Sequence, residues 1–277
     1  MITSDYCRKS AISVYAALLL ILTACSSSEE KASYSLNNFN LRSYQAGDVL
    51  NYSTQGSRTT TRNGIIDVSG EMSTRYTDSA VSTPPGNLVS QFNTLLTEDT
   101  SVVLSGNNVA NLTRDFYQDA AGNLYVASLV WPDGNRLWLS PQTGTDSATN
   151  QVDVSVQWLA SPIDSTTTQT RTFDLHLCDT NLNSCELIGN GQERQTYVGF
   201  DNQETPYAHF ESIAIDYALS FNITKQVSGF TADKCESSGT RWIYPALGVV
   251  KFTLSYQCQN ETLDLIVAIN STTIKLN

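Results

Sequence analysis

Histidine and methionine are nearly missing from this sequence, which contains only two residues of each type. Because zinc, haem and copper sites draw their ligands largely from such side chains, this shortage removes most designs for a metal centre. Basic residues are also scarce, since 16 lysines and arginines stand against 27 aspartates and glutamates, for a formal net charge of -11. We therefore expect no nucleic-acid partner, because phosphate binding needs an excess of basic side chains. We also expect no cofactor.

The one long apolar run covers residues 11–24 and is too short for a membrane-spanning helix, which needs about 20 residues. It follows Arg8 and Lys9 and stops at Cys25. A basic leader, a short apolar stretch and small residues before the stop are typical of a secretory signal peptide. The last four residues, Leu22-Thr23-Ala24-Cys25, resemble the lipobox of bacterial lipoproteins.

The lipobox resemblance implies that the signal, residues 1–24, is cleaved and that Cys25 becomes the first residue of the mature chain. Its thiol would carry diacylglycerol and its amino group an acyl chain such as palmitate, and two or more chains anchor a protein stably in a membrane. Ser26 in place of aspartate implies, by analogy with enterobacterial sorting, an outer-membrane lipoprotein. We expect its domain to face the periplasm, and exposure at the cell surface is the alternative. Residues 25–40 are polar at first and predict a flexible tether to a domain over residues 41–277.

Four of the six cysteines remain once Cys7 leaves with the signal and Cys25 takes lipid. An even number of cysteines in an oxidising compartment indicates disulfides, and four cysteines allow three pairings. Closure of the short turn-rich segment 179–184 favours one pairing among them. In it, Cys178 bonds to Cys185, which leaves Cys235 for Cys258.

Alternation of apolar and polar residues dominates the exported part. Residues 213–223 give the clearest strand, and residues 152–158, 173–177, 250–256 and 263–269 repeat the pattern. Strands with one apolar face indicate antiparallel pairing. Glycine-containing turns at 63–64, 105–107, 121–123 and 132–135 fall between candidate strands and predict hairpins. Trp158 is expected in the core.

One helix is expected after Pro84-Pro85-Gly86, where Leu88, Phe92, Leu95 and Leu96 have helical spacing. The sequence therefore predicts a mainly β protein with at most one or two short helices. Its antiparallel curved sheet would form an open barrel or a sandwich, in one or two layers.

A second resemblance rests on two segments, Gly47-Asp48-Val49-Leu50-Asn51-Tyr52 and Gly239-Thr240-Arg241-Trp242-Ile243-Tyr244-Pro245-Ala246-Leu247-Gly248-Val249-Val250-Lys251. They resemble motifs of a loose group of uncharacterised secreted bacterial proteins and lipoproteins. The resemblance implies export and fold and carries over no activity. In physical terms, the second motif is a turn that should pack Trp242 and Tyr244 onto the sheet.

Two sets of residues are weak candidates for a catalytic site or a metal site. Asp174 and His176 share one face of a predicted strand, where a carboxylate could orient an imidazole for base catalysis, although a solvated polar face explains them as well. Asp179, Asn181 and Asn183 match the first half of a calcium loop. The second half fails, because Ser184 stands where glycine is needed and Asn190 where a bidentate glutamate is needed, so we expect no metal.

The sequence therefore indicates an envelope lipoprotein with a structural or binding role rather than an enzyme. Its partners would be the membrane, through the lipid, and an envelope protein or an apolar ligand. The main alternative is a carrier of lipid or another apolar ligand, because a curved antiparallel sheet can enclose an apolar cavity. A hydrolase of envelope polymers is the third hypothesis, and it would use Asp174 and His176.

Overall fold

The computed structural model describes residues 33–34, 41–61, 64–78, 94–118, 123–130, 136–141, 156–159, 168–178, 185–225, 233–258 and 261–276. The chain divides into two compact units, Met1–Ser33 and Tyr34–Asn277. The expected signal peptide and almost all of the expected tether lie outside the described residues. No helix within the described ranges has the length and hydropathy needed to cross a membrane.

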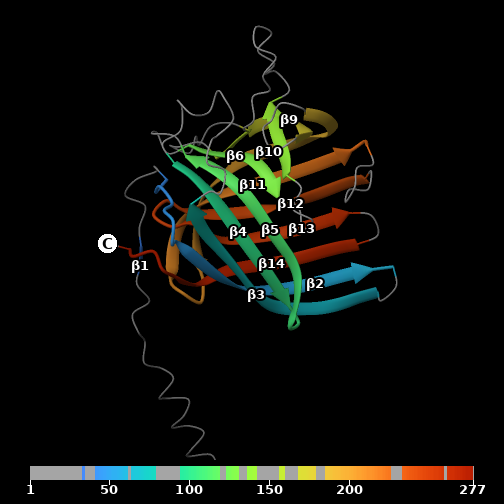
Figure 1. Cartoon of the computed structure of the whole chain (residues 1–277). Coiled ribbons are helices and arrows are strands. Elements are labelled where there is room, and N and C mark those ends of the chain that lie inside the picture. The colour runs from blue at the N-terminus through green and yellow to red at the C-terminus, as the bar shows by residue number, and fades with distance from the viewer. Residues whose placement is uncertain are drawn as a thin grey trace, which may run out of the picture. The chain divides into compact units, whose positions relative to one another are not determined.

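Strands account for almost all of the described residues (Figure 1). They are β1 (Ser33–Tyr34), β2 (Val49–Thr60), β3 (Gly64–Asp78), β4 (Thr94–Leu104), β5 (Asn107–Gln118), β6 (Leu124–Val130), β7 (Arg136–Pro141), β8 (Val156–Leu159), β9 (Thr168–Cys178), β10 (Cys185–Glu204), β11 (His209–Ile223), β12 (Asp233–Tyr244), β13 (Gly248–Cys258) and β14 (Glu261–Thr272).

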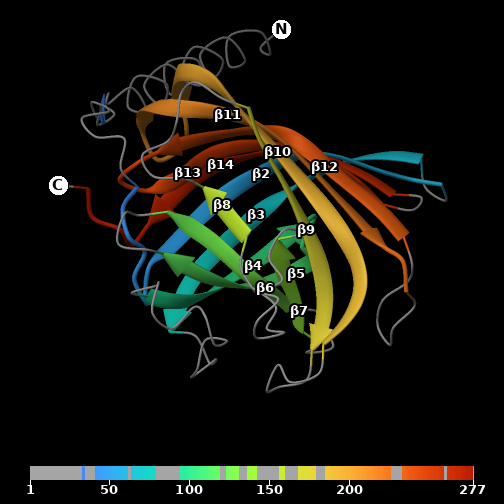
Figure 2. The same cartoon turned by 90° about the horizontal axis from the view of Figure 1, so that it is seen from above.

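Twelve of these strands form a closed antiparallel barrel. Their order is β11-β10-β9-β7-β6-β5-β4-β3-β2-β14-β13-β12, and β12 pairs again with β11 to close the ring. Strand β8 pairs with β6 outside this ring. Figure 2 shows the sheet bending round, so that β10, β11 and β12 face β4, β5 and β6. The predicted mainly β fold with an antiparallel curved sheet is confirmed. The sheet closes on itself and forms a barrel.

Apolar side chains alternate along the strands as the sequence predicts, although Ser212 and Ala214, on the opposite face of β11, are buried as well. On β11, Ile213, Ile215 and Tyr217 are buried, whereas Asp216 between them is exposed. Neighbouring strands continue the same face, because Ile215 pairs with Arg241 of β12 and with Tyr197 of β10. The buried face is therefore the interior of the barrel, and each strand contributes every second residue to it.

Two of the expected hairpin turns are confirmed. Leu104 of β4 pairs with Asn107 of β5 across Ser105 and Gly106, whose φ angles are 50° and 78°. Positive φ at both central residues defines the type I′ turn that suits the twist of a hairpin. Gly64, with φ of 67°, pairs with Thr60 and begins β3. The other two predicted turns lie partly or wholly outside the described residues.

The prediction of a helix is wrong for the last residues of the expected segment. Leu95 and Leu96 lie in β4, where Leu96 pairs with Asp78 of β3 and is buried. Two adjacent leucines are compatible with the start of a strand as well as with the last turn of a helix. They are in a strand because this segment pairs with β3 and β5. Leu88 and Phe92 lie outside the described residues, as does the side chain of Trp158.

The two ends of the barrel differ in burial. We call the end where β2 and β13 begin the motif end, and the end where β12 begins at Asp233 and β13 finishes at Cys258 the disulfide end. Along β14, Ile269 and Val267 near the motif end have no exposed area, while Leu263 near the disulfide end is half-buried. Along β14, burial of the interior side chains therefore decreases from the motif end toward the disulfide end.

Candidate functional site

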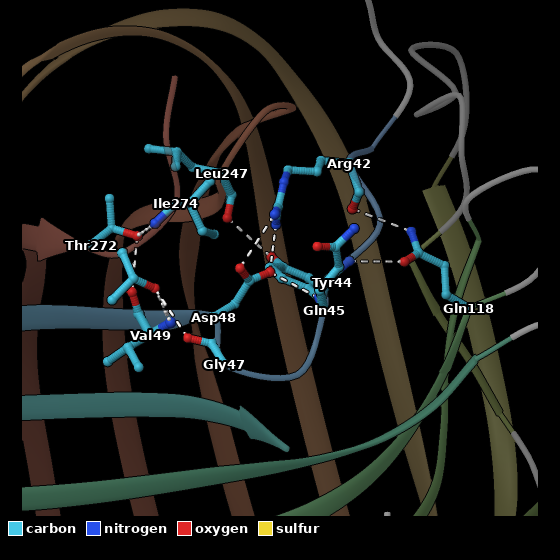
Figure 3. Close-up of polar contacts among 11 residues, drawn as sticks. Arg42, Tyr44, Gln45, Gly47, Asp48, Val49, Gln118, Leu247, Thr272 and Ile274 are labelled. Atoms are coloured by element: carbon cyan, nitrogen blue, oxygen red, sulfur yellow. Dashed lines mark hydrogen bonds and ion pairs between the residues drawn. The ribbon is translucent and has the colours of Figure 1, made fainter. Parts of the chain in front are cut away.

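The two sequence motifs lie side by side at the motif end (Figure 3). The segment that precedes β2 crosses to the turn between β12 and β13. There the Tyr44 hydroxyl donates to the Leu247 carbonyl at 3.2 Å, and the Arg42 amide donates to the Pro245 carbonyl at 2.9 Å. These bonds join residues about 200 positions apart in the chain. The motifs thus have a structural part in this protein, because together they close one end of the barrel.

Asp48 organises the turn that leads into β2. Its Oδ2 atom accepts from the Arg42 guanidinium at 2.5 Å and from the Gln45 amide at 2.9 Å. On the backbone, Gly47 and Asp48 pair with Tyr76 through two hydrogen bonds of 2.9 Å. Gly47 has φ of 95°, which explains a glycine at this position. An aspartate that hydrogen-bonds the backbone near its own position is typical of such turns.

The C-terminal end of the described chain is tied to the same turn (Figure 3). Thr272 donates its hydroxyl to the Val49 carbonyl at 2.9 Å. The Thr273 hydroxyl accepts from the Val49 amide at 2.9 Å and donates to the Gly47 carbonyl at 3.2 Å. The first and last long strands of the barrel are therefore fastened to each other beside the motif.

Gly248, in the second motif, has a steric role. Its φ is 92°, and a Cβ atom placed there would lie 1.6 Å from the Tyr44 hydroxyl oxygen. Only glycine fits both the backbone conformation and this close approach. Tyr244, four residues earlier, is buried and its ring lies 5.3 Å from that of Phe210. Trp242 is partly buried and packs against the same core, so the turn packs its aromatic residues as the sequence predicts.

A buried polar network begins directly behind this closure. The ring of Tyr44 stacks on Tyr76 with centroids 4.2 Å apart, and the Tyr76 hydroxyl donates to Glu98 Oε2 at 2.9 Å. Arg114 donates from its Nε atom to Glu98 Oε1 at 2.9 Å and also from Nη2 to the same oxygen. Tyr76, Glu98 and Arg114 are cross-strand neighbours on β3, β4 and β5. Glu98 thus holds a charge-assisted pair in the interior.

The pKa values of these residues reflect their burial. Burial raises the pKa of the Tyr76 hydroxyl well above its ordinary value, and the neighbouring Glu98 carboxylate raises it further. Burial alone would lower the pKa of Arg114, but the Glu98 carboxylate raises it above the ordinary value. The tyrosine therefore stays protonated and able to donate, and the arginine stays charged.

A second carboxylate, Glu193 on β10, lies between two arginines in the interior. Arg241 of β12 donates from Nη1 to Glu193 Oε1 at 3.2 Å, and its guanidinium carbon lies 3.9 Å from the centroid of the Tyr217 ring. Arg171 of β9 places its Nη1 atom 4.0 Å from Glu193 Oε2. The side chain of Glu193 is only 5% exposed. The Glu193 carboxylate also interacts electrostatically with the Glu98 pair, because it raises the pKa of Arg114.

The interior network carries more positive than negative charge. It consists of three guanidinium groups, on Arg114, Arg171 and Arg241, and two carboxylates, on Glu98 and Glu193. Sequence reasoning missed all five residues. A signal was present for one of them, because Arg171 shares the parity of Phe173 and Leu175 and thus belongs to the apolar face of its strand.

An apolar wall lines the interior beside this network and continues from there toward the disulfide end. We use the name for the interior-facing, half-buried side chains of five strands that pack against the core. They are Met72, Val102, Leu219, Phe221, Ile223, Phe252, Leu254 and Leu263. Half-buried apolar residues in such number on one inner surface leave part of it able to contact an apolar ligand.

A separate groove of about 550 Å³ crosses the outer face of β9 to β13. Its floor consists of small residues in register, Ala218, Ser238 and Ser255, and its walls include Arg194 and Glu236. Nine of its eleven lining residues have hydroxyl, amide or charged side chains. The groove is therefore polar, in contrast to the apolar wall inside the barrel.

The weak catalytic candidates lie together on the outer face of β9. Phe173 and Leu175 are buried in the interior, while Asp174 and His176 alternate with them and are half-buried. Burial lowers the pKa of His176, and the Asp174 carboxylate partly offsets this effect. A lowered pKa favours a neutral imidazole, which is compatible with a base but does not define one. Both an enzymatic role for this pair and its absence stay predictions.

The remaining candidates divide between described and undescribed residues. Cys235 and Cys258 form a disulfide in the structure, with Cα atoms 4.3 Å apart. The backbones of Cys178 and Cys185 are cross-strand partners at the ends of β9 and β10. Cys25, Asp179, Asn181 and Asn183 lie outside the described residues. Within the described ranges, no three histidine, cysteine, aspartate or glutamate side chains gather as a metal site would require.

Comparison with known proteins gives a likeness in structure only. No family model matches the chain, and no curated protein matches its sequence. One similar solved structure is that of a protein described as exported, with a YmcC-like fold, from Bacteroides fragilis. It is 12% identical, the TM-score is 0.39, and the match covers 85% of this chain and 99% of the other.

A protein described as a lipoprotein from Parabacteroides distasonis is 11% identical with a TM-score of 0.40, and the match covers 85% of this chain and 98% of the other. The third, YmcC of Escherichia coli, is described as a lipoprotein. It is 9% identical with a TM-score of 0.28, and the match covers 83% of this chain and 92% of that one. The neighbours are thus described as exported proteins or lipoproteins, and at these identities the likeness concerns the fold alone.

Proposed function

We propose that the protein is an envelope lipoprotein, anchored through lipid on Cys25 to the outer membrane with its β-barrel in the periplasm, where it has a structural or binding role. The observation that carries this proposal is the lipobox Leu22-Thr23-Ala24-Cys25, preceded by a basic leader and an apolar run. The disulfide of Cys235 with Cys258 supports it, because such bonds persist in oxidising compartments.

Substitution of the lipidated cysteine tests the anchor. In cells that are fed an alkyne analogue of palmitate, wild-type protein should be labelled and should sediment with outer membranes. Cys25→Ala should abolish the label and release the protein from those membranes, because the thiol that accepts the lipid is gone. Cys7→Ala is the matched control, since Cys7 lies in the same leader but outside the lipobox, and it should leave labelling unchanged. Persistent labelling of Cys25→Ala would contradict the proposal.

The second candidate function is that of a carrier for an apolar ligand. The apolar wall favours it, because eight apolar side chains of the interior stay only half-buried. In a barrel with a single structural role, the same residues would bury more of their surface by packing against one another. The buried network at the motif end would then form the floor of the carrier.

The carrier function predicts a bound ligand in the purified protein. Full-length lipoprotein extracted in mild detergent should show, by native mass spectrometry, one non-covalent amphiphile per chain in addition to its covalent acyl chains. The mass of the anchor on Cys25 serves as the internal control for lipid retention. Organic extraction would then identify the amphiphile. A protein that carries its anchor and nothing else would favour the structural role over the carrier.

A further inference from the structure

Arg171 is the least satisfied charged residue of the interior network. Its Nη1 atom is buried and has no hydrogen-bond acceptor, while its Nη2 atom donates to Gln169. The closest carboxylate oxygen to Nη1, Glu193 Oε2, is 4.0 Å away, which is too far for a hydrogen bond. The side chain as a whole is only 12% exposed. A buried guanidinium nitrogen without an acceptor costs free energy unless something else supplies one.

The charges around Arg171 show what is missing. Glu193 is shared, because its Oε1 atom accepts from Arg241 at 3.2 Å. Glu98 is occupied by Arg114 and Tyr76. Burial lowers the pKa of Arg171, Glu193 acts against this, and Arg241 lowers the pKa further. Among these described residues three guanidinium groups stand against two carboxylates, so a single additional carboxylate would make their charges equal.

The apolar wall begins next to this unbalanced charge. Leu219 is the cross-strand partner of Glu193, which is itself the partner of Arg171. Two residues further toward the disulfide end, Phe221 and Phe173 meet edge to face with ring centroids 5.8 Å apart. From there the wall continues through Leu254 on β13 and Leu263 on β14, which lie on the same interior face of these two paired strands. A ligand that reaches Arg171 from the disulfide end would therefore contact hydrocarbon along its length.

We propose that the barrel binds a long-chain fatty acid, with its carboxylate at Arg171 and its hydrocarbon chain along the apolar wall toward the disulfide end. This inference rests on the carrier function and names its ligand class. A monoanion fits better than a phosphate monoester, which carries close to two negative charges and would leave these groups with a net negative charge. The carboxylate would supply the acceptor that Nη1 lacks, and a guanidinium binds a carboxylate through parallel hydrogen bonds.

Photocrosslinking with a fatty acid tests the proposal on the full-length lipoprotein in a non-ionic detergent. The probe is palmitic acid with a diazirine in its chain and a terminal alkyne. Illumination should attach it to peptides from β11, β13 or β14 that carry wall residues. Unlabelled palmitic acid should compete, whereas methyl palmitate, which has the same chain without the charge, should compete about tenfold less well.

Arg171→Met provides the matching change in the protein. Loss of one charge-assisted contact should raise the probe concentration needed for half-maximal labelling by about tenfold. Arg194→Met is the control variant. Arg194 lies on the adjacent strand β10 but on the exposed outer face, next to the polar groove. It should label like the wild type. Because the acid and ester are compared on wild-type protein, the proposal stays testable even if Arg171→Met folds poorly.

Two results would overturn the inference, and they differ from failure of the carrier function. Equal competition by the acid and the ester, with labelling on the wall, would show that the barrel holds apolar chains without selecting a carboxylate. Labelling that maps to the outer face, or that responds to Arg194→Met, would place the site elsewhere. No labelling and no co-purifying amphiphile would instead remove the carrier function itself.

Discussion

Gly248→Ala is expected to lower the free energy of unfolding by about 3 to 5 kcal/mol. The added Cβ would lie 1.6 Å from the Tyr44 hydroxyl oxygen, in a backbone conformation with φ of 92°. Backbone strain of this kind costs about 1 to 3 kcal/mol, and forcing an extra carbon into a packed site costs a similar amount. Because Tyr44 also hydrogen-bonds Leu247, displacement of its ring should disturb the closure of the motif end. Urea unfolding followed by tryptophan fluorescence measures the loss.

Gly47→Ala separates the two contributions. Gly47 has nearly the same φ, 95°, but a Cβ atom there would have no heavy atom within 4 Å. Only backbone strain remains, so this variant should lose about 1 to 2 kcal/mol. Tyr44→Phe removes the atom closest to the new Cβ, and in the background of Gly248→Ala it should recover part of the stability. Equal losses for the two glycine variants would show that the contact with Tyr44 does not restrict residue 248.

The fold could be predicted from the sequence as far as its strands but not as far as its closure. Alternation along residues 213–223 and 263–269 identified strands and their buried faces, since one residue in two is apolar. The turn at Ser105 and Gly106 could be read from local chemistry as well. That β12 returns to pair with β11 depends on strand order, which no local pattern contains.

The charged network was beyond a reading of single strands for a similar reason. Glu98 lies 16 residues from Arg114, and Glu193 lies 48 residues from Arg241, so each pair is brought together by the barrel and not by neighbouring positions. A charged residue within a strand is ordinarily assigned to the solvated face. Arg171 shows the limit of that rule, because parity places it with Phe173 on the buried face.

The two motifs acquire a physical meaning that the sequence alone did not give them. Asp48 and Gly47 form the turn that leads into β2, and Gly248 leaves room for the Tyr44 hydroxyl. The Tyr52 hydroxyl donates to the Val249 carbonyl of β13, 2.9 Å away. All of these contacts lie at the motif end. The resemblance therefore concerns residues that close this end of the barrel.

The Glu98 pair gives the second large effect. We expect Glu98→Gln to destabilise the protein by about 3 kcal/mol, because breaking a buried ion pair leaves the Arg114 guanidinium without its carboxylate. The Glu98 side chain is 4% exposed and accepts from both Arg114 and Tyr76. Glu261→Gln is the matched control, since Glu261 binds Arg58 at 2.8 Å but both side chains are about 40% exposed. Exposed pairs contribute about 0 to 1 kcal/mol, so this variant should change little.

Replacing both members of the Glu98 pair shows whether the charge itself is responsible. If the loss in Glu98→Gln comes from the stranded guanidinium, then Glu98→Leu combined with Arg114→Met should be more stable than Glu98→Gln alone, because no buried charge is left unpaired. The amide oxygen of Glu98→Gln can still accept from Tyr76, whereas the double variant removes this acceptor, so a gain in stability would come from Arg114 in spite of that loss. Urea denaturation of the wild type, Glu98→Leu, Arg114→Met and the double variant completes a double-mutant cycle. A double variant that is less stable than either single variant would mean that the pair stabilises the barrel mainly through packing and hydrogen bonds.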